Sequence, residues 1–337
     1  MIKKIIISVL VLGVLVLCGW KLFFDGSSVD KQLKDLNTAF TSYHMEANME
    51  IGEGETNRNF YVQVDYKKDD KDQFRISLTD KDINQEQILL RNKEGVYVLT
   101  PVLNQVYTFK GDYPLSSPKP YLYQSIISSL DGEYDLSSVS DGYLLTFDVK
   151  YDNEPNWTKQ EVKLSNDLKP VWTYIYDNEN QVVVKVMFTK VEFETTFEND
   201  YFDVDYNMRQ AKENISSSHV STTIEDLPLI SDTNSLSSTL KEQTKIEQDG
   251  VVSYILTYEG EKSYTVFQTL LTASSIEEYA SIEVEGTFVD TLYGIGYIQG
   301  KCLNYLYHDV SYEIYSSDLS VSEMIDVVTN MEIEAVK

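Results

Sequence analysis

Histidine and cysteine, which often carry metal or nucleophilic chemistry, are rare in this sequence. The three histidines are His44, His219 and His308, and none stands in an HxH, HExxH or Cys–His spacing. Zinc sites need several such ligands at short spacings. The sequence also contains no G-x-S-x-G elbow and no phosphate-binding P-loop. We therefore expect no enzyme activity, no metal and no other cofactor.

The two cysteines have different surroundings. Cys302 lies in the run GKCLNYL, without a basic neighbour that would activate its thiol, so we expect a buried and inert side chain. Cys18 lies in an apolar run at the N-terminus, and the two cysteines are not expected to form a disulfide. An exported protein with so little cysteine is typical of a Gram-positive bacterial surface.

Acidic residues are plentiful but form no recognisable site. Asp200, Asp203 and Asp205 in ENDYFDVDY could suggest calcium, but the glycine turn and the final glutamate of an EF-hand loop are absent. A solvated strand edge is the better interpretation. The run KKDDKD at 67–72 is typical of an exposed hairpin tip.

The charge balance restricts the classes of partner. The 337 residues carry 28 Lys and Arg against 54 Asp and Glu, a net charge of −26. Such a surface repels nucleic acid and anionic lipid headgroups. Contact with a membrane would therefore need a hydrophobic anchor, and we predict no nucleic-acid partner. The length is comfortable for two domains.

Residues 1–24, MIKKIIISVLVLGVLVLCGWKLFF, supply such an anchor. As a helix, Ile5 to Trp20 would span about 24 Å, and about 30 Å if Lys21 snorkels. One interpretation is an uncleaved single-pass anchor. The other is a lipoprotein signal with Cys18 acylated, although Leu17 replaces the usual small residue before the cysteine. Either places residues from about 25 onward outside the cell membrane.

Alternation of apolar and polar residues indicates antiparallel strands along most of the remaining chain. We expect a domain over residues 30–205, consisting of a curved sheet and two helices, one near 29–42 and one near 116–130. Residues 206–245, rich in Ser and Thr, are interpreted as a linker. We expect residues 246–337 to form a smaller α+β domain, with strands that include residues 282–289 and 297–305. Its last helix is expected to follow a capping box of Ser320 and Glu323.

The run VLTPVLNQVYTFKGDYPLSSPKPYLYQSIISSL at 98–130 carries a resemblance. Its Pro101, Asn104-Gln105, Tyr107 and Pro-Tyr-Leu helix resemble exported lipoproteins related to the outer-membrane lipoprotein carrier LolA, in the branch of spore-forming bacteria. YEIYSSDLSVSEMIDVVTNME at 312–332 looks like the small second domain of LolA-like periplasmic sigma-regulating proteins. The resemblance implies an α+β fold, in which an antiparallel half-barrel wraps over helices and a smaller α+β domain follows.

In the carriers, the concave apolar face of the half-barrel receives acyl chains. The resemblance therefore implies a non-enzymatic extracytoplasmic binding protein that holds a lipid, lipoprotein or lipid-linked ligand. The alternative is a sporulation or envelope scaffold that binds a protein partner, such as a cell-wall amidase or an anti-sigma factor, without a lipid. The candidate ligand-binding residues are Met45, Met49, Phe60, Val62, Val64, Phe74, Ile76, Leu78, Ile88, Leu90, Val96 and Val98. An ordinary filled core is the competing interpretation of the same residues.

Overall fold

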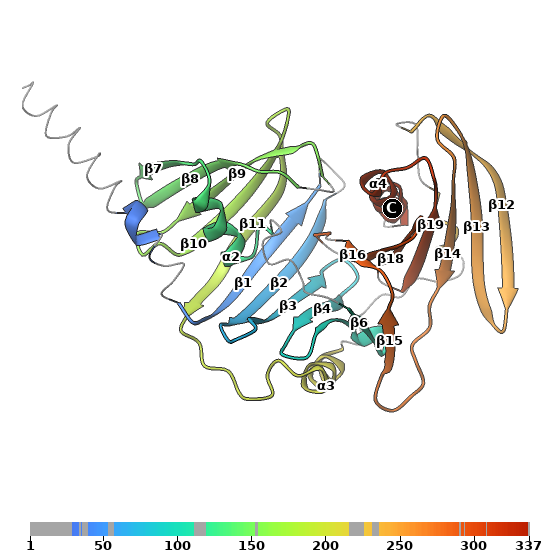
Figure 1. The fold of residues 1–337 in the computed structure, drawn as a ribbon, viewed down its shortest axis with the longest axis horizontal. Helices are drawn as coiled ribbons and strands as arrows, with labels where there is room; N and C mark the ends of the chain where they lie inside the picture. The colour runs from blue at the N-terminus through green and yellow to red at the C-terminus, as the bar shows by residue number, and fades with distance from the viewer. Residues whose placement is uncertain are drawn as a thin grey trace, which may run out of the picture.

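The chain folds into two β-sheets joined side by side, with few helices (Figure 1). This computed structural model describes residues 29–33, 35, 40–52, 57–110, 119–151, 154–215, 226–230, 236–289, 291–292, 294–307 and 309–335. One sheet is curved and the other is open, so the expected α+β class is confirmed in a form dominated by strands.

The first sheet contains twelve strands in the described part of the chain, in the order β15-β6-β5-β4-β3-β2-β1-β11-β10-β9-β8-β7. Its strands are β1 (Ser42–Ile51), β2 (Arg58–Lys67), β3 (Gln73–Asp80), β4 (Gln85–Arg91), β5 (Val96–Thr100), β6 (Gln105–Phe109), β7 (Asp135–Val139), β8 (Gly142–Asp148), β9 (Trp157–Leu164), β10 (Pro170–Asp177), β11 (Val182–Phe193) and β15 (Ala280–Val284). Neighbouring strands are antiparallel except β15, which pairs with β6 in parallel.

The second sheet has seven strands among the described residues, in the order β12-β13-β14-β19-β18-β17-β16. They are β12 (Ser238–Gln248), β13 (Val251–Gly260), β14 (Tyr264–Leu270), β16 (Thr287–Val289), β17 (Ile295–Gln299), β18 (Cys302–Tyr307) and β19 (Val310–Tyr315). The helices are α2 (Tyr123–Ser128), α3 (Val204–Asn214) and α4 (Val321–Ala335), with short 3₁₀ turns η1 (Pro101–Leu103) and η2 (Ser129–Asp131).

The register of the first sheet defines two faces. Met45 pairs with Val64, which pairs with Ile76, and directly paired residues share a face. We call this the inner face. His44, Asp65 and Arg75 pair in the same way on the opposite side, which we call the outer face.

Different elements cover the two faces. On the inner face, α2 and the helical residues 29–33 join the strands in one core, to which Val284, Leu292 and Ile295 also belong. On the outer face, α3 packs against β4, β5 and β6. The short helix expected near 116–130 is therefore present as α2, but helices supply only part of the inner cover, and the rest comes from the C-terminal part of the chain.

The predicted boundaries need correction in three places. The linker expected at 206–245 contains most of α3 and the first residues of β12. Strand β12 was not predicted because it is exposed on both sides and so lacks the hydrophobic alternation that reveals a strand. The strand expected at 282–289 is two strands, β15 in the first sheet and β16 in the second. A turn at Gly300, with φ of +65°, likewise divides the strand expected at 297–305 into β17 and β18.

Candidate binding face

The inner face gathers ten of the twelve candidate ligand-binding residues in one core cluster. Nine are at most 3% exposed, and Leu78 is partly buried against them. The ten residues are Met45, Met49, Phe60, Val62, Val64, Phe74, Ile76, Leu78, Val96 and Val98. Strands β1 to β5 place them together because alternate residues of each strand point to the same side.

The assignment of the other two candidates to this face was wrong. Ile88 pairs with Ser77 and Leu90 with Arg75, so both point to the outer face. There they pack against Met208 of α3. Strand β4 is apolar on both sides, because Leu89 points to the inner face while Ile88 and Leu90 point to the outer face. Its hydrophobic pattern therefore could not show which residues face the inner core and which face α3.

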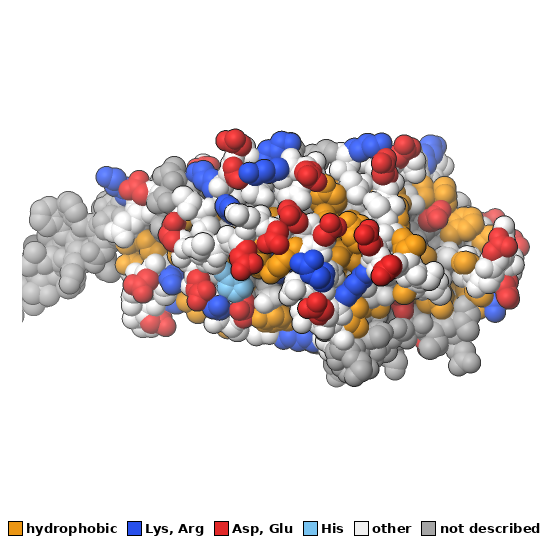
Figure 2. All heavy atoms as spheres, turned by 90° about the horizontal axis from the view of Figure 1, so that it is seen from below, with side chains coloured by type: hydrophobic (Ala, Val, Ile, Leu, Met, Phe, Trp, Pro, Cys, Tyr) orange, Lys and Arg blue, Asp and Glu red, His pale blue; other side chains and the backbone are white. Residues whose placement is uncertain are grey.

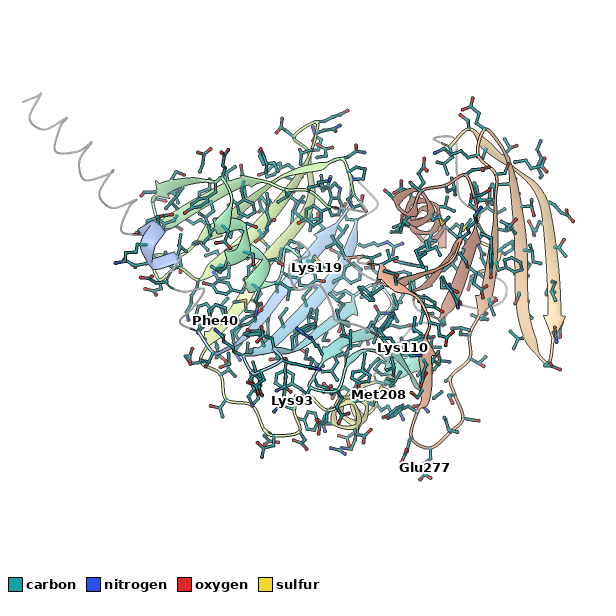
Figure 3. The ribbon with its side chains drawn as sticks, viewed as in Figure 1. Phe40, Lys93, Lys110, Lys119, Met208 and Glu277 are labelled. Carbon is teal, nitrogen blue, oxygen red and sulfur yellow. The ribbon has the colours of Figure 1, made fainter. Side chains whose placement is uncertain are left out.

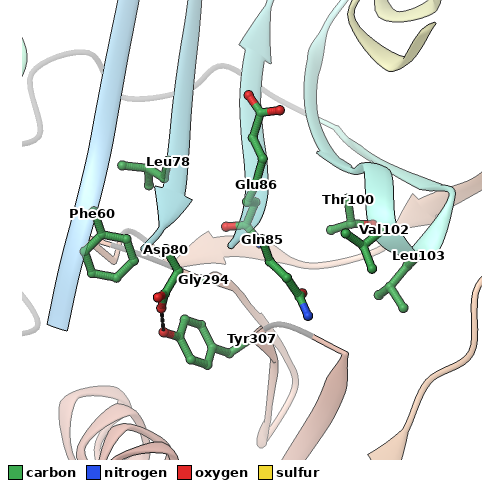
Figure 4. Close-up of a pocket in the computed structure, with 11 residues that line it drawn as sticks. Phe60, Leu78, Asp80, Gln85, Glu86, Thr100, Val102, Leu103, Gly294 and Tyr307 are labelled. Carbon is green, nitrogen blue, oxygen red and sulfur yellow. Dashed lines mark hydrogen bonds between the residues drawn. The ribbon is translucent and has the colours of Figure 1, made fainter. Parts of the chain in front are cut away.

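The inner face is filled in this structure. Residues of α2 cover one part, and Leu292, Ile295 and Leu306 from the C-terminal half of the chain cover another. The cavity lined by Phe60, Leu78 and Tyr307 holds only about 30 Å³ (Figure 4). A second, lined by Ile76, Val98 and Leu292, holds about 20 Å³. Ligand pockets usually measure about 300–1,000 Å³, so these cavities accommodate no acyl chain.

A backbone junction holds the C-terminal part of the chain to the first sheet. Strand β15 continues the sheet beyond β6, and the segment before β15 runs along η1. The Asn104 side chain donates hydrogen bonds to the carbonyl groups of Ser274 (3.1 Å) and Ile276 (2.8 Å). Asn104 has a φ of 54°, in the left-handed region that asparagine tolerates better than most residues. Asn104, from the Asn104-Gln105 pair in the run at 98–130, therefore binds the segment that precedes β15.

Polar side chains complete this junction. Tyr307 on β18 donates a hydrogen bond of 2.7 Å to the carboxylate of Asp80, as Figure 4 shows, and the Arg58 guanidinium lies 4.6 Å from the Tyr307 ring centre. Lys119, which is only 3% exposed, donates to the carbonyl of Thr291 and lies where the two sheets meet (Figure 3). We call these contacts the latch, and we call residues 291–307 the C-terminal segment. Each contact joins that segment to a strand of the first sheet or, at Lys119, to the connection between β6 and α2.

The outer face carries a polar network that sequence reasoning missed. Asp65, 1% exposed, lies 2.7 Å from His44 Nδ1 and accepts a hydrogen bond of 2.8 Å from the Tyr201 hydroxyl. Arg75 lies 3.8 Å from the same carboxylate and donates to Asn207 of α3. The hydrogen bond to Asp65 raises the pKa of His44 above its ordinary value, although partial burial opposes this. The network ties three strands to the segment that leads into α3.

Acidic side chains outnumber the basic ones interspersed with them on the face shown in Figure 2. Within the described residues, no group of three His, Cys, Asp or Glu side chains is placed to hold a metal. Cys302 is 5% exposed, and burial raises the pKa of its thiol. Because the thiolate is the reactive form, a raised pKa makes this cysteine less reactive.

Several predicted features lie outside the described residues. These are His219, His308, the N-terminal segment 1–24 and the possible lipidation site Cys18. In the part of the chain that is described, no helix has the length and apolar character needed to cross a membrane.

No protein-family model matches the chain. The chain is, however, 30% identical over 334 residues to the sporulation protein YdcC of Bacillus subtilis strain 168. The match covers 95% of this chain and 94% of that protein. The chain belongs to the YdcC family. Membership over nearly the full length confirms the branch of spore-forming bacteria that the motif at 98–130 suggested.

Several solved structures have a looser likeness to this YdcC-family chain. The Pseudomonas aeruginosa MucA/MucB complex matches with a TM-score of 0.33 and 14% identity, covering 90% of this chain and 96% of that one. A putative outer-membrane lipoprotein-sorting domain from Vibrio parahaemolyticus matches with a TM-score of 0.31 and 12% identity, over 55% and 99%. The Clostridioides difficile CwlD amidase–GerS lipoprotein complex gives 0.19 and 16%, over 51% and 94%. Function does not follow from likeness at this level.

Proposed function

We propose that this chain is a non-catalytic binding protein, held at the outer side of the cytoplasmic membrane, which serves spore formation by contacting a protein partner. The filled inner face carries this proposal, because nine of its candidate ligand-binding residues are at most 3% exposed and the two cavities that described residues line beside them hold only about 30 Å³ and 20 Å³. The sporulation name of the YdcC relative supports the cellular process, and the apolar segment at 1–24 supports the location.

Lipid binding is the second candidate, and one observation favours it. The cover over part of the inner face comes from the C-terminal half of the chain, which the latch and β15 hold in place. If that cover moved away, an apolar face containing Met45 and Met49 would be exposed, and methionine adapts well to varied apolar ligands. The two candidates therefore differ in whether the latch must open.

A disulfide across the junction tests this difference. Thr108 on β6 pairs with Glu283 on β15, and both side chains are accessible. Neighbouring strands lie about 4.8 Å apart, which suits a disulfide. In a sporulating strain without its own copy of the gene, we expect the oxidised T108C/E283C chain to restore heat-resistant spores as well as the wild type. The single variants T108C and E283C are the matched controls. Loss of function only in the disulfide-locked chain would contradict the proposal and favour a lipid that enters behind the C-terminal segment.

A further inference from the structure

A fully buried glutamine stands in the apolar face of the second sheet. Gln268 on β14 is 0% exposed, and its cross-strand neighbours on the same face are Tyr254 and Tyr312. Helix α4 packs on this face in one hydrophobic core. Because a buried side-chain amide needs hydrogen-bond partners, an amide here points to something that it binds.

The glutamine binds the main chain of a short segment that lies between α3 and β12 in the sequence. Residues 226–230, DLPLI, form this segment, which we call the strap. The Leu229 amide donates a hydrogen bond of 2.8 Å to Gln268 Oε1, and Gln268 Nε2 donates one of 2.6 Å to the Leu229 carbonyl. Neighbouring antiparallel strands recognise each other by the same exchange of two hydrogen bonds with one residue. Gln268 therefore recognises an extended backbone.

The side chains of the strap alternate as those of an extended peptide do. Leu227 and Leu229 are 6% and 7% exposed and belong to the core beneath α4, whereas Ile230 is 38% exposed. Gln268 Nε2 also lies 3.2 Å from the sulfur of Met331 on α4. The strap thus fills a slot between β14 and α4, and we use the word slot for this space.

Few hydrogen bonds hold the strap in the slot. It belongs to neither sheet, and within the described part of the chain the backbone of residues 227–230 forms hydrogen bonds only through Leu229. Segments with so few backbone hydrogen bonds open locally at low free energy. An empty slot, however, would leave the Gln268 amide buried and unpaired, which is costly. Exchange of the strap for another segment is therefore favoured over an empty slot.

We infer that the slot is a peptide-binding site, which the strap occupies in this chain and which an extended segment of a protein partner takes over. The partner segment carries two leucine-like side chains two residues apart, and the second of these residues offers its N–H and C=O groups to Gln268. A lipid or a sugar polymer does not offer this pair of backbone groups. The inference rests on the proposed function, which it deepens by naming the chemistry of the partner. Its test concerns the second sheet, so a failure here leaves the outcome of the disulfide test unchanged.

Binding of the strap sequence from outside tests whether the slot accepts a second segment. The full chain is placed in nanodiscs of neutral phosphatidylcholine, and the probe is a labelled peptide of residues 224–232, IEDLPLISD, followed by anisotropy. The tethered strap competes at an effective concentration on the order of millimolar. We therefore expect L227S/L229S to bind the peptide at least about tenfold more tightly than the wild type. I230S, at the exposed end of the strap, is the matched control and should bind as the wild type does. An L227S/L229S chain that keeps the wild-type circular dichroism but binds no more tightly would overturn the inference.

Methylated peptides test the recognition of the backbone. Methylation of the Leu229 nitrogen removes the donor to Gln268, and we expect it to weaken binding to L227S/L229S at least about tenfold. Methylation of the Ile230 nitrogen is the control, because this amide forms no hydrogen bond with the residues that the structure describes. Equal binding of the two methylated peptides would also overturn the inference.

Crosslinking to the wild-type chain keeps the test valid even if L227S/L229S folds poorly. The peptide carries a diazirine-containing leucine at the position of Leu229 and is used at millimolar concentration, and mass spectrometry locates the crosslinks. We expect them in β14 and α4, on either side of the slot. Crosslinks that lie only in other parts of the chain would show that the peptide binds elsewhere and would overturn the inference.

Discussion

Asp65 joins β2 to the segment before α3 through hydrogen bonds with His44 and Tyr201 on either side. We expect D65N to lower the free energy of unfolding by about 2–3 kcal/mol, because the buried donors around it lose a charged acceptor. Urea denaturation of the full chain measures the change. D70N, at an exposed hairpin tip, should change the stability by less than about 0.5 kcal/mol. An equally small effect of D65N would show that the network does not hold α3 in place.

His44 makes the same network sensitive to pH. Because Asp65 raises the pKa of His44 in the folded chain above the unfolded value of about 6.5, the stabilisation is fully present below that value. It is lost as the pH rises through the raised pKa. We expect the free energy of unfolding to fall over this range in the wild type and to fall less in H44Q, as denaturation at a series of pH values can show. Identical pH profiles for the two chains would contradict this.

Among the elements, α4 depends on a cap that was predicted from the sequence. The Ser320 hydroxyl accepts a hydrogen bond from the Glu323 backbone at 3.3 Å, and the Glu323 carboxylate accepts one from the Ser320 backbone at 2.9 Å. We expect S320A to destabilise the C-terminal part of the chain by about 1 kcal/mol in thermal unfolding. S320T keeps the hydroxyl and should retain most of the stability. If both variants unfold as the wild type does, the cap contributes nothing.

The elements also show where sequence reasoning succeeds and where it stops. Strands with one buried face, such as β1 and β2, alternate clearly and were predicted. Strand β12 is exposed on both sides, and β7 (DLSSV) is mostly exposed, so neither carries a hydrophobic pattern. The placement of Ile88 and Leu90 depends on α3, which lies far away in sequence. The junction of β15 with β6 is a long-range pairing that local patterns cannot reveal.

At the scale of the whole molecule, Glu154, in the connection between β8 and β9, is repelled electrostatically by Asp326 of α4. Burial, together with the charge of Asp326 on α4, raises the pKa of Glu154 from 4.5 to about 7. The folded chain therefore favours the protonated acid, and this contribution to stability is lost as the pH rises from about 4.5 through about 7. We expect E154Q to be more stable than the wild type at pH 8 and to show a flatter pH profile. E133Q, at an exposed position, should follow the wild type; a matching profile for E154Q would contradict the prediction.

The rate of thiol labelling at Val98 shows whether the inner face stays closed beneath the C-terminal segment. Val98 is 3% exposed and lines the small cavity against Leu292, whereas Val139 on β7 is 39% exposed. V98C and V139C are made in the full chain, with Cys18 and Cys302 replaced by serine, and treated with a maleimide in native membranes. We predict labelling of V98C at least about a hundredfold slower than that of V139C, since it requires an opening of the latch. Equal labelling rates would mean that the inner face is open to solvent and not closed by the C-terminal segment.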